Sequence, residues 1–504
     1  MIEKEIEKKK YVFNPCYILR NDINRVILTD SGKEKYDKLG NDNFSEFIHP
    51  IHAMFLSFFK GDKTLSENIK EISYFFSMEE NKTFELVKQF IENRGTIVIE
   101  YDGNFYYYPE KILIENKYNF HRTYCAEDFN ITEKLDFENQ RYNIPIECTI
   151  VVNTTCVTDC IYCYADKINI MKNKIPFERL KAIINETQQL EFKSVDISGG
   201  ELFLYENWYE LLSLLYKNDY EPYLTTKVPI DESEILKLKE LGVEAIQISL
   251  DSVFSDDLEI NLRVGNNYRE RILNTINLLN KYKFRIKIKS VITNPIFDID
   301  KINKSIDYYN RIENIHLVEL TAPGASNYKT NDEFLKYRLS LQQIQCLKEL
   351  IDDNKARGLH FTLGLDAQMY TKEMFDNSVE NKTKNFYSRA RCTGNERSFY
   401  ILPNGDISIC EELYFNKNLK LGSIINNSIM EMWNSAQAKD LFYISQNKIS
   451  QDSYCSKCIE FKECRHKRGI CWVDVISAYG DENWDFPSPE CPYSPPIKNK
   501  FYCE

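Results

Sequence analysis

Three cysteines in the run CVTDCIYC form the first group of residues that could do chemistry. Cys156, Cys160 and Cys163 are separated by three and then two residues. Three thiolates at this spacing could hold three irons of a [4Fe–4S] cube and leave the fourth iron open for a small molecule. A zinc knuckle could use the same spacing, but it normally needs a fourth Cys or His nearby. None follows until residue 316, so the spacing favours an iron–sulfur cluster.

Seven further cysteines are concentrated in the last quarter of the chain. They form the pattern Cys392-x12-Gly405-x4-Cys410, a long gap, Cys455-x2-Cys458-x5-Cys464-x6-Cys471, and finally Cys491. Thiols stay reduced in the cytosol, so such a density there indicates metal rather than disulfides. One cluster with an open iron, together with clusters whose irons are all ligated by the protein, suits redox chemistry on a bound small molecule.

The composition indicates a folded protein of several domains. The chain has 504 residues, 43% of them hydrophobic and 28% charged, and two to four domains are expected. The formal net charge of −12 argues against a nucleic-acid partner, because phosphate binding needs a basic face. The basic run at 281–289 alternates and predicts a strand with one solvated side. No window of about 18 apolar residues and no secretory signal occur, so we expect a cytoplasmic protein without a membrane partner.

Strand and helix patterns alternate over residues 146–335, which predicts an α/β fold. Apolar runs followed by amphipathic helices indicate a parallel sheet curled into a partial (β/α)6 TIM-type barrel. The six runs are 146–152, 194–198, 221–226, 244–250, 285–293 and 314–321. Sites in such barrels lie at the C-terminal ends of the strands. Cys156 follows the first run and therefore lies where chemistry is expected.

Residues 1–115 are predicted to form a separate winged-helix-like domain, joined to the barrel by a polar linker at 116–145. Strands within 17–30 precede the helices, and Asp102-Gly103 marks a hairpin after them. The helices are expected at about 44–59, 66–77 and 81–94.

The chain after the barrel is expected to contain two further parts. Residues 336–391 have the pattern of a bridging helical region. Residues 392–504 have little regular periodicity and many cysteines, so metal is expected to replace a hydrophobic core there.

The first cysteine group and the strand ends after it resemble the signature of radical S-adenosylmethionine (radical SAM) enzymes. The resemblance implies that Cys156, Cys160 and Cys163 hold the open cluster, with Tyr162 beside the cofactor. Gly199-Gly200-Glu201 stands where the family has a GGE motif, and implies that the backbone and Glu201 hold the amino group of S-adenosylmethionine.

Three further segments resemble cofactor-binding segments of the same family. ISLDS implies that Ser249 and Asp251 meet the carboxylate or ribose. Arg263 resembles the arginine whose guanidinium forks onto the carboxylate. Thr226 stands where relatives have TNG, but Asn-Gly is replaced here by Thr226-Lys227, which leaves the ribose contact open. The family's chemistry is one-electron cleavage to a 5′-deoxyadenosyl radical, which abstracts a hydrogen from substrate in a dry barrel.

The later cysteines resemble the SPASM extension, which holds two auxiliary [4Fe–4S] clusters and would bring the total to three. The resemblance implies that one cluster is held by Cys455, Cys458, Cys464 and Cys491, and the other by Cys392, Cys410 and Cys471. The second cluster lacks a fourth thiolate in this pattern. An open iron, a non-cysteine ligand and Cys503 are the alternatives.

Residues 1–115 resemble the PqqD-like recognition element of peptide maturases. In such domains the leader of a precursor peptide adds as a strand beside the sheet and packs on the third helix. Here the edge strand would lie within 17–30 and the helix at about 81–94. A DNA-binding winged helix is the structural alternative, but its recognition helix is not notably basic.

These resemblances together imply a radical SAM/SPASM maturase of a ribosomally made precursor peptide. The expected product is a crosslink, with a thioether from a cysteine sulfur as the leading hypothesis and a flavodoxin- or ferredoxin-type protein as reductant. Alternatives are a carbon–carbon crosslink, epimerisation, or a formylglycine-forming dehydrogenase of the sulfatase-maturating type. A non-catalytic iron–sulfur protein would need neither the GGE nor the SLD segment.

Overall fold

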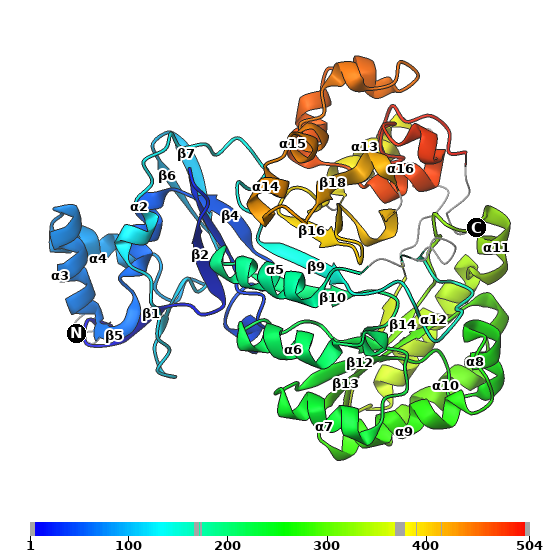
Figure 1. Cartoon of the computed structure of the whole chain (residues 1–504). Coiled ribbons are helices and arrows are strands. Elements are labelled where there is room, and N and C mark those ends of the chain that lie inside the picture. The colour runs from blue at the N-terminus through cyan, green and yellow to red at the C-terminus, as the bar shows by residue number, and fades with distance from the viewer. Residues whose placement is uncertain are drawn as a thin grey trace. The chain divides into compact units, whose positions relative to one another are not determined.

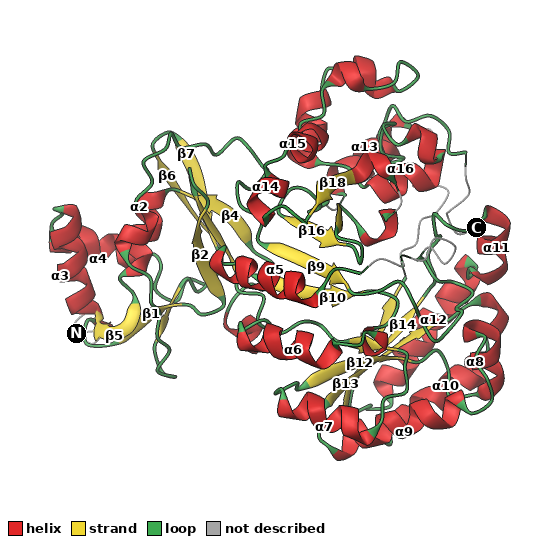
Figure 2. Cartoon of the chain, in the orientation of Figure 1, coloured by secondary structure: helices red, strands yellow, loops and turns green. Residues whose placement is uncertain are grey.

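The computed structural model describes residues 6–165, 171, 174–367, 378–389, 391–414 and 416–498. The chain divides into two compact units, Met1–Ile144 and Pro145–Glu504. Figure 1 shows the elements of both units in chain order, and Figure 2 separates helices from strands.

Over residues 10–115, the first unit contains three small antiparallel sheets and the α-helices α2, α3 and α4. The sheets have the orders β5-β1-β8, β2-β3-β4 and β6-β7. Their strands are β1 (Lys10–Phe13), β2 (Tyr17–Asn21), β3 (Val26–Asp30), β4 (Ser45–Ile48), β5 (Lys60–Thr64), β6 (Ile97–Tyr101), β7 (Asn104–Tyr108) and β8 (Leu113–Glu115). The helices are α2 (Pro50–Ser57), α3 (Leu65–Phe76) and α4 (Glu80–Lys88). The hairpin predicted around Asp102-Gly103 is present as β6-β7.

One predicted helix of this unit begins later than expected. The stretch 44–59 starts with the strand β4, and the helix α2 begins only at Pro50. Proline fits the first helical turn because its missing N–H would have no intrahelical partner there. The side chain of His49 caps the helix by accepting a hydrogen bond from the Ile51 N–H at 3.2 Å.

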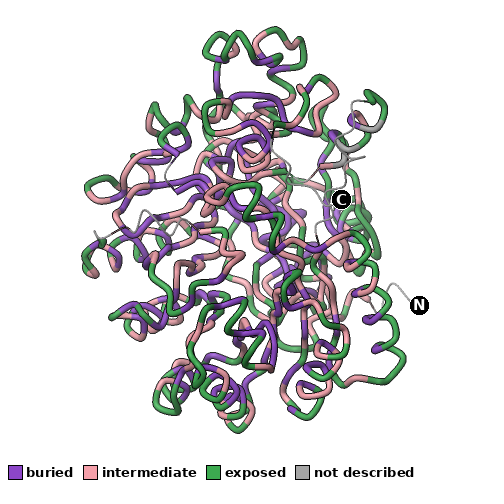
Figure 3. The backbone as a smooth tube through the Cα atoms, turned by 90° about the vertical axis from the view of Figure 1, so that its right-hand side faces the viewer, coloured by how far each residue is buried: buried purple, intermediate pink, exposed green. Residues whose placement is uncertain are grey.

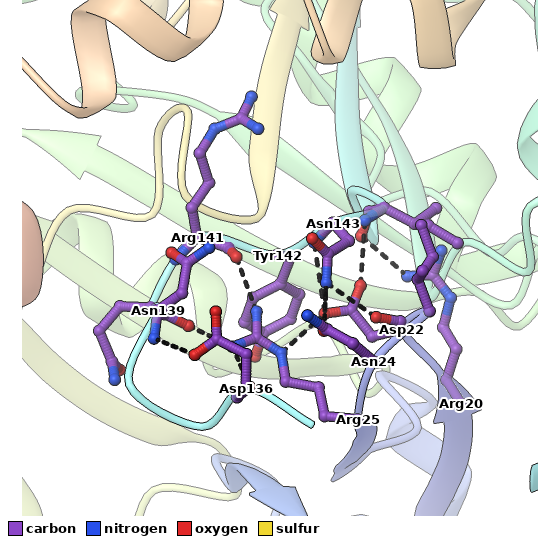
Figure 4. Close-up of polar contacts among 12 residues, drawn as sticks. Arg20, Asp22, Asn24, Arg25, Asp136, Asn139, Arg141, Tyr142 and Asn143 are labelled. Carbon is purple, nitrogen blue, oxygen red and sulfur yellow. Dashed lines mark hydrogen bonds and ion pairs between the residues drawn. The ribbon is translucent and has the colours of Figure 1, made fainter. Parts of the chain in front are cut away.

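The segment 136–144 packs onto the sheet of β2 and β3 through a buried ion pair (Figure 4). Arg25 and Asp22 are 2.9 Å apart, and both side chains are completely buried. The Arg25 guanidinium also donates to three backbone carbonyls, those of Asp136, Asn139 and Arg141. This stretch lies in the predicted linker, yet it has a fixed place on the first unit.

The carboxylate of Asp22 is satisfied from the same segment. Its Oδ1 accepts from the Ile144 N–H at 3.0 Å, and its Oδ2 from the Asn143 N–H at 3.3 Å. The Asn143 side chain donates to the Asp22 carbonyl at 2.8 Å. Burial raises the pKa of Asp22, whereas Arg25 lowers it. Nearly every donor and acceptor of the pair therefore forms a hydrogen bond within the first unit, and we call such a pair closed because it has almost no hydrogen-bonding group left for a ligand.

The second unit is α/β and contains two five-stranded sheets. One has the order β10-β9-β16-β17-β18 and the other is the parallel sheet β11-β12-β13-β14-β15. The strands are β9 (Glu147–Val151), β10 (Ser194–Ser198), β11 (Thr225–Thr226), β12 (Ala245–Ser249), β13 (Arg285–Val291), β14 (Ile315–Thr321), β15 (Thr362–Asp366), β16 (Ser398–Ile401), β17 (Asp406–Ser408) and β18 (Lys420–Ser423). All six apolar runs predicted for 146–335 contain a strand.

Helices connect these strands and cover the sheets. They are α5 (Phe177–Gln189), α6 (Trp208–Lys217), α7 (Glu232–Glu240), α8 (Ser255–Leu262), α9 (Tyr268–Lys281), α10 (Ile299–Tyr309), α11 (Asn331–Tyr337), α12 (Leu341–Ala356), α13 (Val379–Ser388), α14 (Ile429–Trp433), α15 (Ala436–Phe442) and α16 (Trp472–Tyr479). Figure 1 shows α9 and α10 along one side of β13 and β14. Figure 3 shows exposed stretches of backbone mainly at the outer loops and buried stretches further inside.

The basic run at 281–289 forms the predicted strand only from Arg285 onward, as the first part of β13, because Lys281 still ends the helix α9. Ile286 and Ile288 of β13 are buried, and the alternate residues Lys287 and Lys289 form ion pairs with Glu319 at 3.3 and 2.9 Å. The lysines therefore pair along one face of the sheet, as the alternation indicated.

Two regions after residue 335 differ from the sequence prediction. The stretch expected to be helical also contains β15, which pairs in parallel with β14. The region after Cys392 contains β16, which pairs in parallel with β9, and a hydrophobic core that includes Phe399 and Trp433. The expectation that metal replaces a core there was wrong, because apolar side chains from this region join the core of the second unit.

Among the described residues, no helix is both long and apolar enough to cross a membrane.

Candidate functional site

A cavity of about 270 Å³ lies at the C-terminal ends of β9, β10, β11 and β12. All three cysteines of the first group line it, together with the turn after β10 and residues at the ends of β11 and β12. Its predicted site residues are Cys156, Cys160, Tyr162, Cys163, Gly199, Gly200, Glu201, Thr226 and Ser249. Residues about 100 positions apart thus meet in one place, as the strand-end rule predicts.

The cysteine loop is anchored on α8 and on a threonine within the loop. The hydroxyl of Thr158 is 3.3 Å from the sulfur of Cys156 and 3.2 Å from that of Cys160. The backbone N–H groups of Asp159 and Ile161 donate to carbonyls at the end of α8, those of Leu262 and Asn261, both at 2.9 Å. These contacts bring thiols of the loop to one side of the cavity.

Asn153 joins the GGE turn to the beginning of the cysteine loop. Its side-chain amide donates to the Glu201 carbonyl at 2.7 Å and accepts from the Glu201 N–H at 3.2 Å. Gly199 has φ +148°, and a Cβ atom on Gly200 would lie 1.9 Å from the Thr155 carbonyl oxygen. The two glycines therefore permit an approach between the loops that no larger residue allows.

The Glu201 carboxylate is buried at the cavity and is held by the end of β11. Its Oε1 accepts from the Thr226 hydroxyl at 2.9 Å, and its Oε2 accepts from the Lys227 N–H at 3.0 Å. Burial raises the pKa of Glu201, and these hydrogen bonds lower it. The Thr226 hydroxyl thus orients Glu201, and a carboxylate with about four acceptor sites keeps capacity for a ligand N–H.

Lys227 lies at the same cavity as part of a buried triangle with Tyr162 and Asp251. Its ammonium is 2.7 Å from the Tyr162 hydroxyl and 3.2 Å from Asp251 Oδ1, while the Tyr162 hydroxyl donates to Asp251 Oδ2 at 2.6 Å. Burial lowers the pKa of Lys227, but Asp251, Cys160 and Cys156 together outweigh burial and the net effect raises it. The side chain is therefore a cation inside the site.

Two predicted ligand residues do not line this cavity. Asp251 is fully buried behind it, where Oδ1 and Oδ2 also accept from the Val291 N–H and the Asn261 side chain. Arg263 has 63% of its side chain exposed and forms an ion pair with Asp159 at 2.6 Å. The structure brings the GGE, Thr226 and Ser249 positions together with the cysteines, and leaves Arg263 outside.

A second cavity, of about 170 Å³, is lined by four of the later cysteines. They are Cys455, Cys458, Cys464 and Cys491. Arg465 donates to the Cys455 sulfur at 3.3 Å, and Arg389 is 3.9 Å from the Cys464 sulfur. Within the described residues, Nε and Nη1 of buried Arg465 have no partner. Four thiols with unsatisfied guanidinium donors beside them fit an anionic iron–sulfur cluster.

The other three cysteines form a separate group. Cys392 precedes β16, Cys410 follows β17 and Cys471 caps α16. The pKa of Cys471 is raised mainly by burial and next by Asp474. Cys392 and Cys410 raise it as well, so the three thiols lie within electrostatic reach of one another. The structure thus divides the seven cysteines into four and three. Cys503, one candidate for the fourth ligand, lies outside the described residues.

Three functional side chains were missed by sequence reasoning. Asn153 lies two residues beyond the end of β9, so the strand-end position that indicated Cys156 could also have indicated Asn153. Lys227 was noted only as a departure from a motif, although a lysine at a strand end is itself a signal. Arg465 lies in a basic stretch between two cysteines, and nothing in that stretch shows which cation is buried.

Comparison with known families matches two parts of the chain. Residues 150–309 match the Radical SAM superfamily, and residues 392–459 match the SPASM iron–sulfur cluster-binding domain. The chain therefore combines a radical SAM domain with a C-terminal SPASM domain, and both predictions are confirmed. S-adenosylmethionine and iron–sulfur clusters are the cofactors that these domains indicate.

Individual relatives are distant. The subtilosin biosynthesis protein AlbA of Bacillus subtilis is 21% identical over 369 residues, which cover 71% of this chain and 74% of AlbA. A probable GTP 3′,8-cyclase of Thermoplasma volcanium is 22% identical over 213 residues, covering 40% of this chain. The chain matches 61% and 64% of the length of the first two curated relatives.

One solved structure shares the fold over nearly the whole chain. Streptococcus suis SuiB bound to S-adenosylmethionine has a TM-score of 0.60 at 17% identity, covering 95% of this chain and 99% of SuiB. SuiB has also been solved bound to its precursor peptide SuiA, with a TM-score of 0.60 and 15% identity to this chain. The similarity shows that this chain shares the fold of SuiB over nearly its whole length.

Proposed function

We propose that this chain is a radical SAM maturase that modifies a ribosomally made precursor peptide in the cytoplasm. The observation that carries the proposal is the cavity where three cysteines, the GGE turn and the ends of β11 and β12 meet. That donor set fits an open iron–sulfur cluster with S-adenosylmethionine beside it. When bound, this pair supplies one-electron cleavage of a carbon–sulfur bond and a hydrogen-abstracting radical.

The residues of the cavity would bind and orient the cofactors. Cys156, Cys160 and Cys163 would hold three irons, and Glu201 would accept hydrogen bonds from the amino group of S-adenosylmethionine. Thr226 holds Glu201 in place by its hydrogen bond at 2.9 Å. Ser249 lines the cavity near the end of β12 and would offer a hydroxyl to the ribose or carboxylate.

Two auxiliary clusters would give a total of three. We assign Cys455, Cys458, Cys464 and Cys491 to one, on the evidence of the shared cavity and the guanidinium of Arg465. The other would be held by Cys392, Cys410 and Cys471, with an open iron or a non-cysteine fourth ligand. A thiolate of the substrate would be a suitable ligand for an open iron, which supports thioether formation as the reaction. A flavodoxin- or ferredoxin-type protein would supply electrons.

The first unit would bind the leader of the precursor by strand addition. The sheet β2-β3-β4 has two edge strands. Arg122 donates to the Tyr17 carbonyl at 2.7 Å and the Leu19 N–H donates to the Tyr124 hydroxyl at 3.1 Å, so β2 is already contacted along its edge. The sequence placed this edge within 17–30; because β2 is contacted in this way, we instead assign the incoming strand to the other edge strand, β4 (Ser45–Ile48), which is paired with β3 and contacted by the Tyr142 hydroxyl at Ser45. SuiB bound to SuiA supports a precursor peptide as the partner of this fold.

A direct test uses the reconstituted protein, S-adenosylmethionine, dithionite and a synthetic cysteine-containing precursor encoded beside this chain. We expect 5′-deoxyadenosine and a peptide product that has lost two hydrogen atoms per crosslink, detected by mass spectrometry. The control is the triple Cys156→Ala, Cys160→Ala, Cys163→Ala variant, in which both products are expected to be absent. If the wild-type protein forms no 5′-deoxyadenosine, it is not a radical SAM enzyme.

The same mass spectrum separates the alternative reactions. A thioether removes a free thiol from the peptide, whereas a carbon–carbon crosslink leaves every thiol available for alkylation. Epimerisation leaves the mass unchanged, and conversion of cysteine to formylglycine replaces the sulfur by oxygen and removes two hydrogen atoms. Hydrogen exchange with added leader tests the docking site, because β4 is expected to become protected and β2 is not.

A further inference from the structure

The cavity around the three cysteines contains one cationic side chain among its described lining residues, Lys227. The lysine lies where the peptide chain leaves β11, and its backbone N–H is fixed by Glu201 at 3.0 Å. The Tyr268 hydroxyl fixes its carbonyl at 2.7 Å. Its side chain is 17% exposed, whereas that of its partner Asp251 is fully buried. Lys227 is thus largely buried, and it is one of the residues that line the cavity.

The hydrogen bonds of this ammonium leave one donor for a ligand. A lysine ammonium has three N–H donors. Within the described residues, one donates to the Tyr162 hydroxyl at 2.7 Å and one to Asp251 Oδ1 at 3.2 Å. The ammonium thus has two fixed partners on one side and an unused donor on the other. The two fixed partners already restrict the rotamers of Lys227. Most of the side-chain entropy that a free lysine would lose on binding a ligand is therefore lost before the ligand binds.

Asp251 holds this lysine and has no acceptor sites left for a ligand. Its Oδ1 accepts from Lys227 and the Val291 N–H, and its Oδ2 from Tyr162 and the Asn261 side chain. These four donors match the approximate acceptor capacity of a carboxylate. These hydrogen bonds also stabilise the negative charge of Asp251, so the ammonium of Lys227 is only one of several groups that compensate this charge. Asp251 is therefore a positioning residue for Lys227.

We propose that Lys227 binds the carboxylate of S-adenosylmethionine through its unused donor, in the place that the motif resemblance assigned to Arg263. The assignment rests on the proposed function, because it requires S-adenosylmethionine in this cavity. Charge and position both favour it: Lys227 lines the cavity, whereas the Arg263 guanidinium is exposed and paired with Asp159 at 2.6 Å. A charge-assisted hydrogen bond in a partly desolvated site is the strong kind.

Equilibrium binding to the reconstituted full-length protein, without reductant, tests this assignment. Calorimetry would compare S-adenosylmethionine with its decarboxylated analogue, which lacks the carboxylate and keeps the rest of the molecule. In Lys227→Met we expect the affinity for S-adenosylmethionine to fall by roughly 30-fold. The affinity for the decarboxylated analogue should change by less than about threefold, because that ligand has nothing for the ammonium to bind.

Three further variants make the test specific. Lys227→Arg keeps a cation and should recover most of the affinity for S-adenosylmethionine. Lys281→Met removes a surface lysine that pairs with Glu232 at 2.7 Å and should bind both ligands as the wild type does. The double variant Lys227→Met, Asp251→Asn leaves no unpaired buried charge, and it should show the same selective loss if Lys227→Met alone folds poorly. Iron content is measured in each.

The possible results are distinguishable. Equal affinities of Lys227→Met and wild type for S-adenosylmethionine would overturn the assignment, as would equal losses for the two ligands in both Lys227→Met and the double variant. A selective loss in Arg263→Met with none in Lys227→Met would return the role to Arg263. Absence of S-adenosylmethionine binding in the wild-type protein would instead refute the proposed function itself.

Discussion

The two units each contain a buried ion pair, and the pairs differ in what surrounds the cation. Arg25 and Asp22 in the first unit are both completely buried, and the guanidinium donates to three backbone carbonyls of the segment 136–144. Lys227 and Asp251 in the second unit share a tyrosine hydroxyl, but the cation faces a cavity. The first pair is closed by the chain, whereas the second leaves a donor for a ligand.

This difference separates a structural role from a binding role. A buried cation whose hydrogen bonds all end on its own chain can contribute only to folding, because nothing else can reach it. A buried cation with an unused donor at a cavity costs free energy to desolvate until a ligand arrives. The two pairs therefore predict opposite outcomes in experiments that measure stability and binding together.

The largest effect on stability is expected from Arg25→Met. The substitution leaves the Asp22 carboxylate buried without its cation and removes the donor for the carbonyls of Asp136, Asn139 and Arg141. Breaking a buried pair from one side costs about 3–5 kcal/mol. Hydrogen exchange of peptides from 17–30 and 136–144 measures this loss in the first unit alone.

The matched control for this substitution is Lys9→Met, which removes a partly exposed cation paired with Glu115 at 3.1 Å. It should leave exchange unchanged within error. Binding of S-adenosylmethionine should be the same in Arg25→Met and wild type. Normal protection of 136–144 in Arg25→Met would show that the segment does not depend on the pair.

A pH effect of intermediate size is expected in the first unit from His52. Burial, with a smaller contribution from His49, lowers the pKa of His52 from 6.5 to about 4. Above pH 6.5 the imidazole is neutral in the folded and unfolded states. As the pH falls from 6.5 toward 4, only the unfolded state takes up the proton, so stability falls by about 2–3 kcal/mol over this window.

The variant His52→Gln isolates the contribution of this one group. The amide keeps a hydrogen-bonding partner for the buried Tyr108 hydroxyl, which contacts His52, and it does not titrate. Denaturation at pH 7 and pH 4.5 should show a smaller loss in the variant than in wild type. Equal losses would assign the pH dependence to other groups.

A smaller loss of stability is expected from Lys227→Met. After the substitution Asp251 still accepts hydrogen bonds from Tyr162, Asn261 and the Val291 N–H. We expect about 1–2 kcal/mol, because only one of four donors is lost and a water molecule in the cavity can replace it. Hydrogen exchange of the stretch 245–262 measures this change. If Lys227→Met destabilised its unit as much as Arg25→Met, the distinction between the two pairs would be wrong.

The sequence predicted the elements of the candidate site better than the partners of its side chains. The cysteine loop and the GGE turn were placed correctly because both directly follow apolar strand patterns. The role of Arg25 was not predictable, since its carbonyl partners lie more than 100 residues away in a stretch without periodicity. The same applies to Lys227, whose partners come from the cysteine loop and from the residue two positions beyond β12.

Two errors in the predicted elements have local physical causes. The strand β4 was included in a helix because its residues 45–48 adjoin the apolar run of α2. Pro50, which favours the first turn of a helix, was the available signal for the boundary. The core after Cys392 was missed because its strands are only three or four residues long, too short for a clear periodicity, and one of them is completed by pairing with β9.

The smallest expected effect is that of Tyr162→Phe, which tests whether Lys227 must be held in position. The phenylalanine keeps the ring, whose centroid lies 5.3 Å from the Lys227 ammonium, and removes the hydroxyl that joins Lys227 to Asp251. Lys227 then has only Asp251 as a fixed partner and a larger choice of rotamers. Affinity for S-adenosylmethionine should fall about threefold to fivefold, and stability by about 1 kcal/mol. Tyr282→Phe, which removes an exposed hydroxyl that donates to Glu232 at 2.6 Å, is the control and should change affinity by less than twofold. A loss in Tyr162→Phe as large as that in Lys227→Met would mean that the tyrosine hydroxyl contacts the ligand itself, because loss of positioning alone leaves the cation in the cavity.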